Sequence, residues 1–496
     1  MKLSQLLDNI ICERIAGDTD IAVTGVQSDS RQVRPANVFV AVSGPALDGH
    51  RFIPRAIEAG ATAVVCEHIP ADAASDVVWV QVPDAAEALG YLASEWYGNP
   101  SRKLTLVGVT GTNGKTTVAT LLYEAARMAG HEAGLLSTVE NRVADERFAT
   151  TNTTPSPLEI NRLLAMMVEK GCTFAAMECS SHGQVQKRTA GLHFAGAVFT
   201  NLTRDHLDYH KTFDAYLAAK KSLFDDLPDT AWALVNADDP HGTVMLQNTR
   251  AARHTYSMRA DADFRGRDIE NRIDGTLMSV NGTEVETHFA GKFNCYNLLA
   301  VYGALCLMGE TPDEAALTLS RLVPVAGRFQ WFRSDDGVTV VVDYAHTPDA
   351  LANVLDTIRA VRSRGAAVVT VTGAGGNRDH GKRPQMGREA ALRSDRLIIT
   401  SDNPRDEDPA DIAEDIKGGV PVDRDVQTDI ILDRAAAIHA AVMEANAGDI
   451  ILIAGKGHED YQEFASHRRI HFDDREQARS AIAARNTELA EQAGDR

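Results

Sequence analysis

The sequence predicts an α/β protein of three domains, because the chain is long and because short apolar runs alternate with helical segments along all of it. At 496 residues the chain is too long for a single hydrophobic core. Two breaks interrupt the alternation, at residues 98–101 and at residues 325–327. We therefore expect domains at residues 1–98, 99–326 and 327–496.

The first domain is predicted to be a small α/β unit. Its strand-like apolar runs lie at residues 36–42, 61–67 and 76–82. The segment RFIPRAIEAG is helix-like, and DAAEALGYLASEWYG has the pattern of an amphipathic helix. The residues 98–101, Gly-Asn-Pro-Ser, are expected to form a linker because glycine and Asn-Pro break regular structure.

The second and third domains are each predicted to contain a mostly parallel sheet, whose ligand-binding loops gather at the carboxyl ends of the strands. The strand-like runs of the second domain are LTLVGVT, FAAMECS, AGAVFTNL and AWALVNAD. Those of the third domain, which we expect to be Rossmann-like, are TVVVDYAH, AAVVTVTGAGG, DRLIITSDNP and DIILIAGKGH. Each of these four ends in glycine or polar residues, where ligand-binding loops are expected.

The composition is that of an ordinary globular protein, with 44% hydrophobic and 24% charged residues. The formal net charge of −19 disfavours nucleic acid and membrane surfaces as general partners, because both would repel the chain. Six cysteines without a C-x-x-C pair are typical of reduced thiols in a cytoplasm. No signal peptide and no membrane span are predicted, so we expect a cytoplasmic protein.

The residues 104–117, LTLVGVTGTNGKTT, predict a phosphate-binding loop between a strand and a helix. Its glycines let backbone N–H groups approach phosphate oxygens, the helix adds positive potential, and Lys115 adds a full charge. The Thr116 hydroxyl has the position of a magnesium ligand in P-loop proteins. Val109 stands where the standard spacing has glycine, so GTNGKTT is a variant loop. The motif predicts a P-loop-type ATPase domain in the middle of the chain.

Two other strand ends in this domain carry candidate metal ligands. Glu178 directly follows an apolar run, and a buried carboxylate there favours a magnesium contact. His206 and His210 are spaced i, i+4, which leaves zinc as an alternative, although Leu207 replaces the glutamate of H-E-x-x-H. Beside a P-loop, a magnesium or phosphate role for His206 is the simpler hypothesis.

Further polar residues lie in helical surroundings and near the second break. Lys220 and Lys221 fall in a helical run, where solvated lysines are the ordinary expectation. Asn294 and Asn297 precede an apolar helix, which suggests a cap or a polar contact near a nucleotide. Arg328 lies at the boundary of the third domain, and a mobile domain that carries an arginine can complete a phosphate site on closure.

The third domain holds three polar clusters. Asp343 follows an apolar strand and has the appearance of a Walker B aspartate. Arg378, Lys382 and Arg383 lie among glycines, a composition that favours anion binding. The residues 403–405, Asn-Pro-Arg, predict a rigid turn whose guanidinium is suited to bidentate capture of a carboxylate.

Taken together, these motifs resemble the Mur ligase family, the cytoplasmic ATP-dependent ligases that build the peptide stem of peptidoglycan. The matching motifs are GTNGKTT, ECSSHG, DHLDYH, AAK at 218–220, FNxxN, GR, DYAH and DNPR, in the family's order and over almost the whole chain. The resemblance also covers SDSR at 28–31 and DGHRF at 48–52, where a UDP moiety would bind.

The resemblance implies an acyl-phosphate mechanism with ATP and Mg²⁺. ATP would phosphorylate the D-glutamyl γ-carboxylate of UDP-N-acetylmuramoyl-L-alanyl-D-glutamate, and the amine of meso-diaminopimelate would then displace phosphate. Lys115, Lys220 and His206 would serve catalysis, with Lys220 carbamylated to N6-carboxylysine. Asp343 would contact ATP and is thereby reassigned from Walker B. We expect a monomer that acts in cell-wall synthesis and thus in cell division and cell shape.

The resemblance implies four groups of binding residues. The nucleotide would contact Gly111, Thr112, Asn113, Gly114, Lys115, Thr116, Thr117, Asn294, Arg328 and Asp343. Magnesium would be held by Thr116, Glu178, His206 and Lys220. The UDP substrate would contact Ser30, Thr153, Thr154, Ser180, Gln186 and Arg188. Diaminopimelate would contact Arg378, Asp402, Asn403, Arg405, Gly455 and Glu459.

Three places depart from the family pattern, namely Gln330, Asn377 and the residues 44–47 on the uridine side. A ligase for L-lysine is the nearest alternative, and Arg405 argues against it because lysine lacks the distal carboxylate. Folylpolyglutamate synthetase shares the loop but is disfavoured by SDSR and DNPR. A nucleotide switch or a kinase-like protein is disfavoured by the three-domain layout and by the absence of N-K-x-D.

Overall fold

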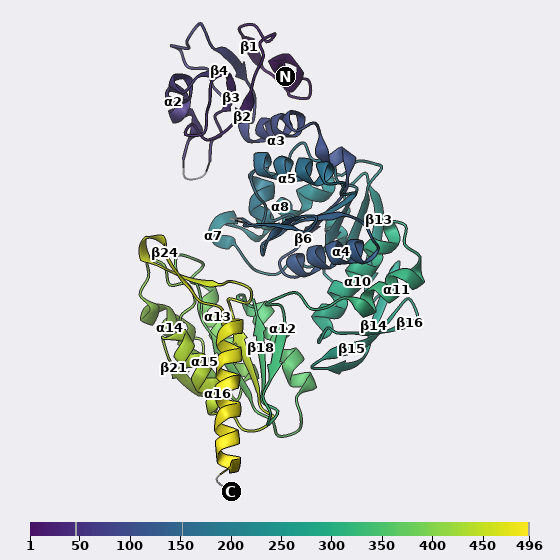
Figure 1. Cartoon of the computed structure of the whole chain (residues 1–496), viewed down its shortest axis with the longest axis vertical. Helices are drawn as coiled ribbons and strands as arrows, with labels where there is room; N and C mark the ends of the chain where they lie inside the picture. Colours follow the sequence, from purple (N-terminus) through teal and green to yellow (C-terminus); the bar gives the residue numbers. More distant parts are fainter. Residues whose placement is uncertain (45–46, 151, 495–496) are drawn as a thin grey trace.

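The computed structural model describes residues 1–44, 47–150 and 152–494. Figure 1 shows three α/β units stacked along the longest axis, which we call the N-terminal, central and C-terminal units after their sheets. The mixed α/β class with mostly parallel sheets that the sequence predicts is confirmed. No helix within the described residues is long and apolar enough to cross a membrane.

The N-terminal unit has a five-stranded sheet in which only β1 runs antiparallel to its neighbour. In sheet order the strands are β1 (Arg14–Ala16), β5 (Val78–Gln81), β4 (Ala61–Cys66), β3 (Asn37–Val40) and β2 (Gly25–Gln27). Its helices are α1 (Leu3–Leu6), α2 (Ile53–Glu58) and α3 (Ala85–Trp96), with a 3-10 turn at Gly49–Phe52. The three apolar runs of the sequence therefore become β3, β4 and β5, while β1 and β2 were not predicted.

The central unit has an eleven-stranded sheet that is parallel from β14 to β7 and antiparallel at both ends. In sheet order the strands are β16 (Thr283–Thr287), β15 (Gly275–Val280), β14 (Phe264–Arg272), β13 (Ala252–Ser257), β12 (Trp232–Asn236), β11 (Gly196–Phe199), β6 (Thr105–Thr110), β10 (Phe174–Glu178), β7 (Ala133–Leu136), β8 (Asn141–Val143) and β9 (Glu146–Phe148). Strand β6 thus lies in the middle of the sheet, between β11 and β10, and carries the P-loop at its carboxyl end.

Helices cover both faces of this sheet and form two apolar cores. One core is built with α4 (Lys115–Met128), α10 (Lys292–Leu307) and α11 (Pro312–Arg321). The other is built with α5 (Pro157–Glu169) and α8 (Phe213–Asp225). Short helices at the carboxyl edge are α6 (Ser181–Val185), α7 (Leu207–His210) and α9 (Gly242–Met245), and a 3-10 turn at Pro100–Lys103 precedes β6.

The C-terminal unit has a six-stranded sheet that is parallel except for the edge strand β17. In sheet order the strands are β17 (Gln330–Arg333), β18 (Thr339–Asp343), β22 (Ile450–Ala454), β19 (Val368–Thr372), β20 (Arg396–Ile399) and β21 (Gln427–Ile430). Its helices are α12 (Pro348–Val361), α13 (Lys382–Arg393), α14 (Pro409–Lys417), α15 (Arg434–Met443) and α16 (Asp474–Gly494). A separate hairpin joins β23 (Tyr461–Phe464) to β24 (Arg468–His471) through a 3-10 turn at Ala465–His467.

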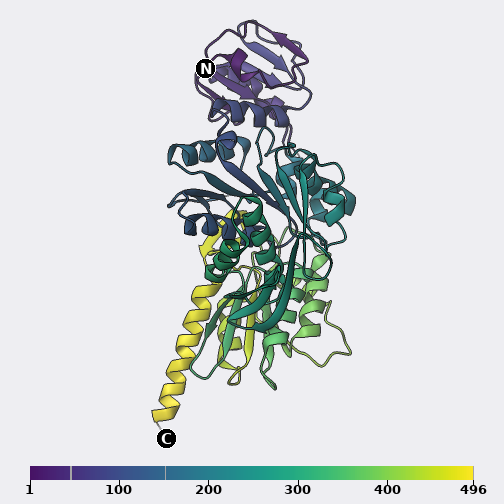
Figure 2. The same ribbon diagram turned by 90° about the vertical axis from the view of Figure 1, so that its right-hand side faces the viewer.

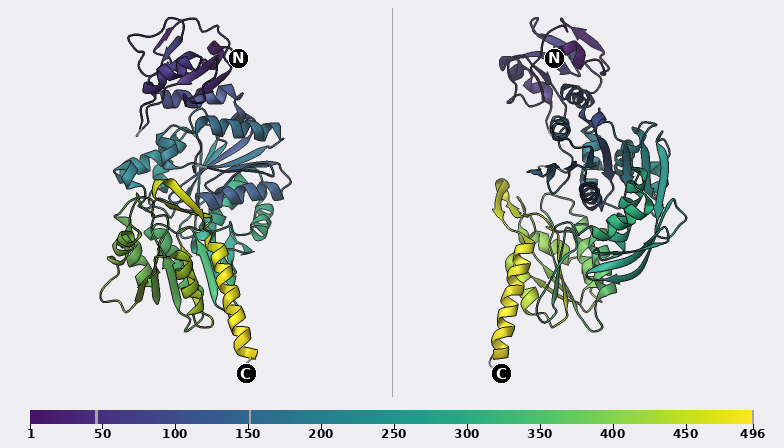
Figure 3. Two further views of the ribbon diagram at one scale, coloured as in Figure 1. Left: turned by 60° about the vertical axis from the view of Figure 1, so that its left-hand side comes forward. Right: turned by 45° about the vertical axis from the view of Figure 1, so that its right-hand side comes forward.

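Helix α16 runs along the outside of the C-terminal unit and extends past its lower end (Figure 2; Figure 3). Its first residue, Asp474, forms a buried two-oxygen ion pair with Arg434 of α15, with both N···O distances 2.7 Å. Both side chains are 0% exposed. Arg434 also donates to the carbonyl of Ala454 at the end of β22, at 3.0 Å. This pair therefore ties α15, α16 and β22 together beneath the loops of the unit.

Replacing Asp474 with alanine should destabilise the protein by about 3–5 kcal/mol, because the Arg434 charge then stays buried without a partner. Glu476→Gln is the matched control, since Glu476 pairs on the surface with His471 at 2.8 Å and such a pair is worth about 0–1 kcal/mol. Urea unfolding of both variants measures the difference. Equal midpoints for the two variants would contradict a structural role for the buried pair.

Candidate active site

The P-loop leaves β6 at Thr110 and ends where α4 begins at Lys115. Gly111 and Gly114 have φ angles of +152° and +87°. A Cβ atom on Gly111 would lie 1.9 Å from Thr200 Oγ1, and one on Gly114 would lie 2.5 Å from Asn297 Oδ1. Glycine is therefore required at both positions, and the loop folds as the sequence predicts.

The Lys115 side chain folds back over this loop. Its Nζ atom donates hydrogen bonds to the carbonyls of Gly111, at 2.9 Å, and of Thr112, at 2.8 Å. Burial lowers the pKa of Lys115, while the carboxylates of Glu178 and Asp205 raise it. The ammonium group thus sits inside the loop, where it can meet a phosphate.

A cavity of about 480 Å³ lies at the P-loop, between the central and C-terminal units. The central unit contributes Asn113, Gly114, Lys115, Thr116, Thr117, Glu178, His206 and Asn297 to its lining, among others. The C-terminal unit contributes Arg328, Asp343, Tyr344, His346 and Asp349, among others. The lining of this cavity therefore includes residues that the sequence assigns to two different domains.

Two hydrogen bonds cross from the C-terminal side to the P-loop. Arg328 Nη2 donates to Thr116 Oγ1 at 3.0 Å, and Asn113 Nδ2 donates to Asp349 Oδ2 at 3.1 Å. The Arg328 guanidinium stacks 4.5 Å from the centre of the Tyr344 ring. Its Nε atom is buried and has no hydrogen-bond partner within the described residues. A buried guanidinium with an unused donor suits an anionic ligand in this cavity.

The two remaining nucleotide candidates outside the loop lie close to it. Asp343 is buried, its Oδ2 accepts from the Phe329 amide at 2.7 Å, and burial raises the pKa of its carboxyl group. Asn294 lies one turn before Asn297 on α10, and its Oδ1 accepts from Asn297 Nδ2 at 3.3 Å. Asn297, which contacts the loop at Gly114, thus links Asn294 to the P-loop.

Glu178 ends β10, next to β6, and is 0% exposed. Its two carboxylate oxygens accept from the amide of Thr138, at 2.7 Å, and from the Thr138 hydroxyl, at 3.1 Å. Glu178 forms no ion pair with a residue in the described part of the chain. A fully buried carboxylate that has only neutral hydrogen-bond donors suits a bound cation.

His206 and His210 differ in their surroundings. The His206 side chain is 43% exposed, lines the cavity and lies 3.4 Å from Asp205. His210 is buried, and its Nε2 atom is 2.9 Å from the Ser181 hydroxyl. Within the described residues no group of three or more His, Cys, Asp and Glu side chains is arranged to hold a metal ion. The magnesium hypothesis involves a different set of ligands, because it includes a threonine, Thr116, and a lysine, Lys220.

Lys220 and Lys221 are neighbours with opposite environments. Lys220 is 1% exposed, donates to the carbonyl of Gly111 at 2.6 Å and lies 4.6 Å from the centre of the Tyr216 ring. Burial and the nearby charge of Lys115 hold the pKa of Lys220 well below its usual value. Lys221 instead forms an ion pair with Asp225 within α8. The expectation of a solvated lysine is therefore wrong for Lys220.

Five of the predicted UDP-substrate residues are linked by hydrogen bonds. Thr154 Oγ1 donates to the carbonyl of Glu178 at 2.8 Å and lies 3.0 Å from Ser180 Oγ. Arg188 donates to the carbonyl of Thr154 at 2.5 Å and to Gln186 Oε1 at 2.6 Å. Thr153 joins through Thr138, whose hydroxyl oxygen lies 3.0 Å from Thr153 Oγ1. This network directly adjoins Glu178.

Ser30 lies in the N-terminal unit, after β2, and is 6% exposed. It makes no hydrogen bond to the network around Thr154 in the described part of the chain. Of the uridine-side residues 44–47, which depart from the family pattern, residues 45 and 46 lie outside the described residues.

The predicted amino-acid-binding residues lie in the loops at the carboxyl ends of β19, β20 and β22. Asn403 Nδ2 donates to Glu459 Oε2 at 2.9 Å. Lys456, which sequence reasoning missed, is 0% exposed and donates to Asn403 Oδ1 at 3.0 Å and to Glu459 at 3.2 Å. Asp402 lies 3.7 Å from Lys456, and a Cβ on Gly455 would be 2.5 Å from Asp402. The loops that follow β20 and β22 are thus joined by the hydrogen bonds and ion pairs of the buried Lys456 ammonium group.

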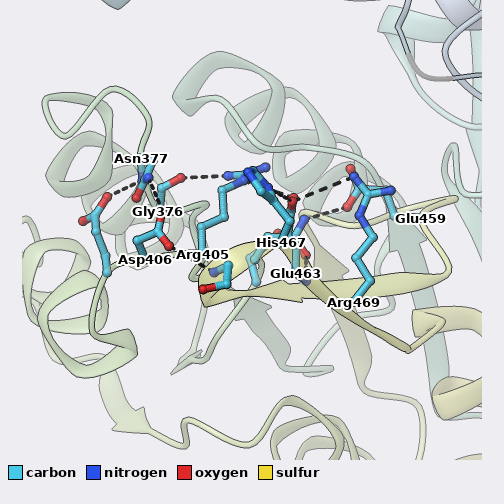
Figure 4. Close-up of polar contacts among 12 residues, drawn as sticks. Gly376, Asn377, Arg405, Asp406, Glu459, Glu463, His467 and Arg469 are labelled. Carbon is cyan, nitrogen blue, oxygen red and sulfur yellow. Dashed lines mark hydrogen bonds and ion pairs between the residues drawn. The ribbon is translucent and has the colours of Figure 1, made fainter. Parts of the chain in front are cut away.

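Arg405 and Arg378 belong to the same neighbourhood. Both side chains lie beside Gly375. A Cβ atom built on Gly375 would be 3.0 Å from Arg405 Nη1 and 3.7 Å from Arg378 Cγ. Arg405 Nε donates to Glu463 at 3.2 Å, and Arg405 Nη1 donates to the carbonyl of Gly376 at 2.7 Å (Figure 4). Arg378 is exposed at the same edge.

Asp406 and Glu407 directly follow Arg405 in the sequence, and a surface ion pair with one of them is the ordinary alternative to a binding role. The structure contradicts it, because Asp406 accepts from Asn377 and Glu407 pairs with Arg383 at 2.8 Å. Glu463 was not predicted from the sequence. Nothing in its local sequence points to Arg405, because Glu463 reads only as an acidic residue within a strand-like segment.

Three family models match the chain in order. They are described as Mur ligase family, catalytic domain, at residues 22–97, Mur ligase middle domain at 109–305, and Mur ligase, glutamate ligase domain, at 327–457. The UDP-N-acetylmuramoyl-L-alanyl-D-glutamate--2,6-diaminopimelate ligase of Bacteroides fragilis is 53% identical over 96% of this chain and 98% of its own. The ligase of the same name from Parabacteroides distasonis is 53% identical over 98% of this chain and 100% of its own.

Solved structures extend the comparison. A structure of a UDP-N-acetylmuramoyl-L-alanyl-D-glutamate--2,6-diaminopimelate ligase matches with a TM-score of 0.70 and 34% identity, over 98% of this chain and 99% of that chain. MurF ligase from Thermotoga maritima in complex with ADP matches with a TM-score of 0.63 and 19% identity, over 94% of this chain and 99% of that chain, which shows a shared fold. From the three models in sequence order and the full-length relatives, it follows that this chain belongs to the Mur ligase family.

Proposed function

We propose that the chain is an ATP-dependent amide ligase that joins meso-diaminopimelate to UDP-N-acetylmuramoyl-L-alanyl-D-glutamate in peptidoglycan precursor synthesis. The reaction runs through an acyl phosphate. An oxygen of the D-glutamyl γ-carboxylate attacks the γ-phosphorus of ATP, and ADP leaves. The neutral amine then attacks the acyl carbon, phosphate leaves with the bonding electrons, and the nitrogen releases one proton. ATP use and ligase chemistry are properties of the family to which the chain belongs.

The observation that carries this proposal is the cavity between two units. A P-loop with Lys115 and Thr116 faces Arg328 from the C-terminal side, and Arg328 reaches Thr116 at 3.0 Å. Phosphoryl transfer to a carboxylate brings two anions together, so positive groups must converge on the same point. Lys115 from the central unit and Arg328 from the C-terminal unit supply these positive groups.

The residues at the P-loop also suit a magnesium ion. Thr116, Glu178 and His206 line the same cavity and offer a hydroxyl, a buried carboxylate and an imidazole. When bound, Mg²⁺ neutralises phosphate charge and polarises the phosphorus–oxygen bonds. Glu178 is the strongest candidate for binding it, because within the described residues its buried carboxylate accepts hydrogen bonds from Thr138 alone and forms no ion pair.

Lys220 completes this set as N6-carboxylysine. Its buried amine has a pKa well below the usual value, so the neutral form that attacks carbon dioxide is available. The amine nitrogen bonds to the carbon of carbon dioxide, one C=O electron pair moves to oxygen, and a proton is released. The product is a carboxylate that replaces a buried amine and offers oxygen ligands to magnesium.

We further propose that the UDP substrate reaches from the N-terminal unit, at Ser30, to the network of Thr154, Ser180 and Arg188. This network adjoins Glu178, so the peptide end of the substrate is held beside the P-loop. The proposed domains remain residues 1–98, 99–326 and 327–496, with the protein acting as a cytoplasmic monomer.

Selectivity for diaminopimelate is assigned to the C-terminal loops. Diaminopimelate is lysine with an additional carboxylate at its far end, and Arg405 offers N–H donors of matching geometry. Glu459 and Asn403, which contact each other at 2.9 Å, orient the ammonium end. Lysine would leave the guanidinium without its anion, which disfavours it as a substrate.

Arg405→Ala should raise the KM for diaminopimelate by about 30-fold or more, because a shielded charge-assisted contact is worth about 2–3 kcal/mol. Steady-state assays with diaminopimelate and lysine measure the effect. Arg396→Ala is the control, since Arg396 pairs at the surface with Asp429 and Glu444 in the same unit. If the KM for diaminopimelate is unchanged in Arg405→Ala, Arg405 does not bind this substrate.

The test of the function is the dependence of phosphate release on substrates. With ATP and Mg²⁺ present, release should require both the UDP-linked dipeptide and an amine. A nucleotide switch would instead hydrolyse ATP without either. Steady release with ATP alone would overturn the proposal.

A further inference from the structure

The β23–β24 hairpin places a buried acidic residue behind Arg405. Glu463 lies on β23, pairs across the hairpin with Arg469, and is only 6% exposed. Its carboxylate accepts from Arg405 Nε at 3.2 Å and lies 3.1 Å from His467 Nδ1 and 3.9 Å from Arg469 Nη2. Figure 4 shows Arg405 held between Gly376 on one side and Glu463 on the other.

The main chain reinforces this contact. The Arg405 amide donates to the carbonyl of Glu463 at 3.0 Å, and the Glu463 amide donates to Asn403 Oδ1 at 2.9 Å. Gln462 Nε2 donates to the carbonyl of Asp402 at 3.0 Å. Residues 402–405 thus run beside β23, and Arg405 forms an isolated parallel β-bridge with Phe464. The β23–β24 hairpin therefore determines the position of this turn.

Two anchors fix the orientation of the Arg405 guanidinium. Glu463 engages Nε and the carbonyl of Gly376 engages Nη1 at 2.7 Å. The Arg405 Nη2 atom has no hydrogen-bond partner in the part of the chain that the structure describes. Because the guanidinium is planar, two anchored nitrogens determine the direction of the third.

We propose that Glu463 is a positioning residue that aims Arg405 at the distal carboxylate of diaminopimelate and thereby sets the preference for this amine over lysine. The inference rests on the proposed function. Glu463 acts through Arg405 and not on the substrate, because its carboxylate is already enclosed by Arg405, His467 and Arg469. Without it, the guanidinium keeps its charge but loses its fixed direction.

Two variants and one control test this role. Glu463→Ala should lower the ratio of kcat/KM for diaminopimelate to kcat/KM for lysine by about ten-fold or more, through KM, with kcat at saturating diaminopimelate within about two-fold of wild type. Glu463→Gln keeps an oxygen that can accept from Nε and should lose an intermediate factor. Asp336→Asn removes another ion pair of the same unit, with Arg485 at 2.6 Å, and should leave the ratio unchanged.

The outcomes separate the inference from the function on which it rests. A wild-type enzyme that uses lysine as well as diaminopimelate would overturn the proposed specificity and this inference with it. A wild type that prefers diaminopimelate, together with Glu463 variants that keep the same ratio, would overturn the inference alone. A fall in kcat with both amines alike would show a merely structural role and would also overturn it. If Glu463→Ala does not fold, Glu463→Gln decides.

Discussion

Lys115→Ala is expected to reduce turnover by about 1,000-fold while the thermal unfolding midpoint stays within a few degrees of wild type. The large loss follows because the ammonium group neutralises the phosphate as it is transferred to a second anion. The small change in stability follows because, within the described residues, the hydrogen bonds of Lys115 go to two carbonyls of the adjoining loop, and alanine is a good residue at the start of a helix. Phosphate-release assays and thermal unfolding measure the two effects.

Lys170→Ala serves as the control for this variant, because Lys170 pairs on the surface with Glu146 at 2.7 Å. It should keep full turnover. If Lys115→Ala also keeps most of its turnover, the proposal that Lys115 binds the transferred phosphate is wrong.

Lys220→Ala is expected to abolish most activity and to be partly rescued by added short carboxylates such as formate or acetate. The rescue is expected because the variant has a small space where the carbamate stood, and a free carboxylate can supply oxygen ligands there. Turnover with and without the added carboxylate measures it.

Lys221→Ala is the matched control, since it changes the adjacent lysine, whose side chain pairs with Asp225. It should retain wild-type turnover and show no response to carboxylates. Intact activity in Lys220→Ala would reject the metal-bridging role of the modified lysine.

Many buried strands of the three sheets were predictable, although the short strand β7 (AGLL) is also buried and was missed. The apolar runs that become β18, β19, β20 and β22 are buried along their whole length except Arg396, so their sequence carries a strong signal. Strand β14 reads FRGRDIENR and alternates between exposed and half-buried positions, so it lacks an apolar run and was missed. The antiparallel end of the central sheet therefore could not be foreseen from apolar runs alone.

The P-loop was predictable because its chemistry is local. Gly111, Gly114 and Lys115 lie within five residues, and both glycines have positive φ angles, which glycine adopts readily. The partners of Arg405 and the burial of Lys456 were not predictable, because they depend on segments about fifty residues apart. Local sequence placed Asp406 and Glu407 beside Arg405, whereas the fold supplies Glu463.

The same limit applies to Lys220. It was expected to be solvated like Lys221, and only the family resemblance singled it out. The fold separates them, because one face of α8 packs under the P-loop while Lys221 turns toward Asp225. Lys220 shares the buried face of α8 with Tyr216 and Leu223, a helical spacing that the sequence prediction did not use.

The most direct test of the central claim is the identity of the product. Wild-type protein is incubated with ATP, Mg²⁺, the UDP-linked dipeptide and an equimolar mixture of diaminopimelate and lysine, and the products are identified by mass spectrometry. The account predicts a UDP-linked tripeptide that has gained diaminopimelate with loss of one water, formed with one ADP per amide bond. A product that contains lysine in equal amount, or ADP formed without any new amide, would contradict it.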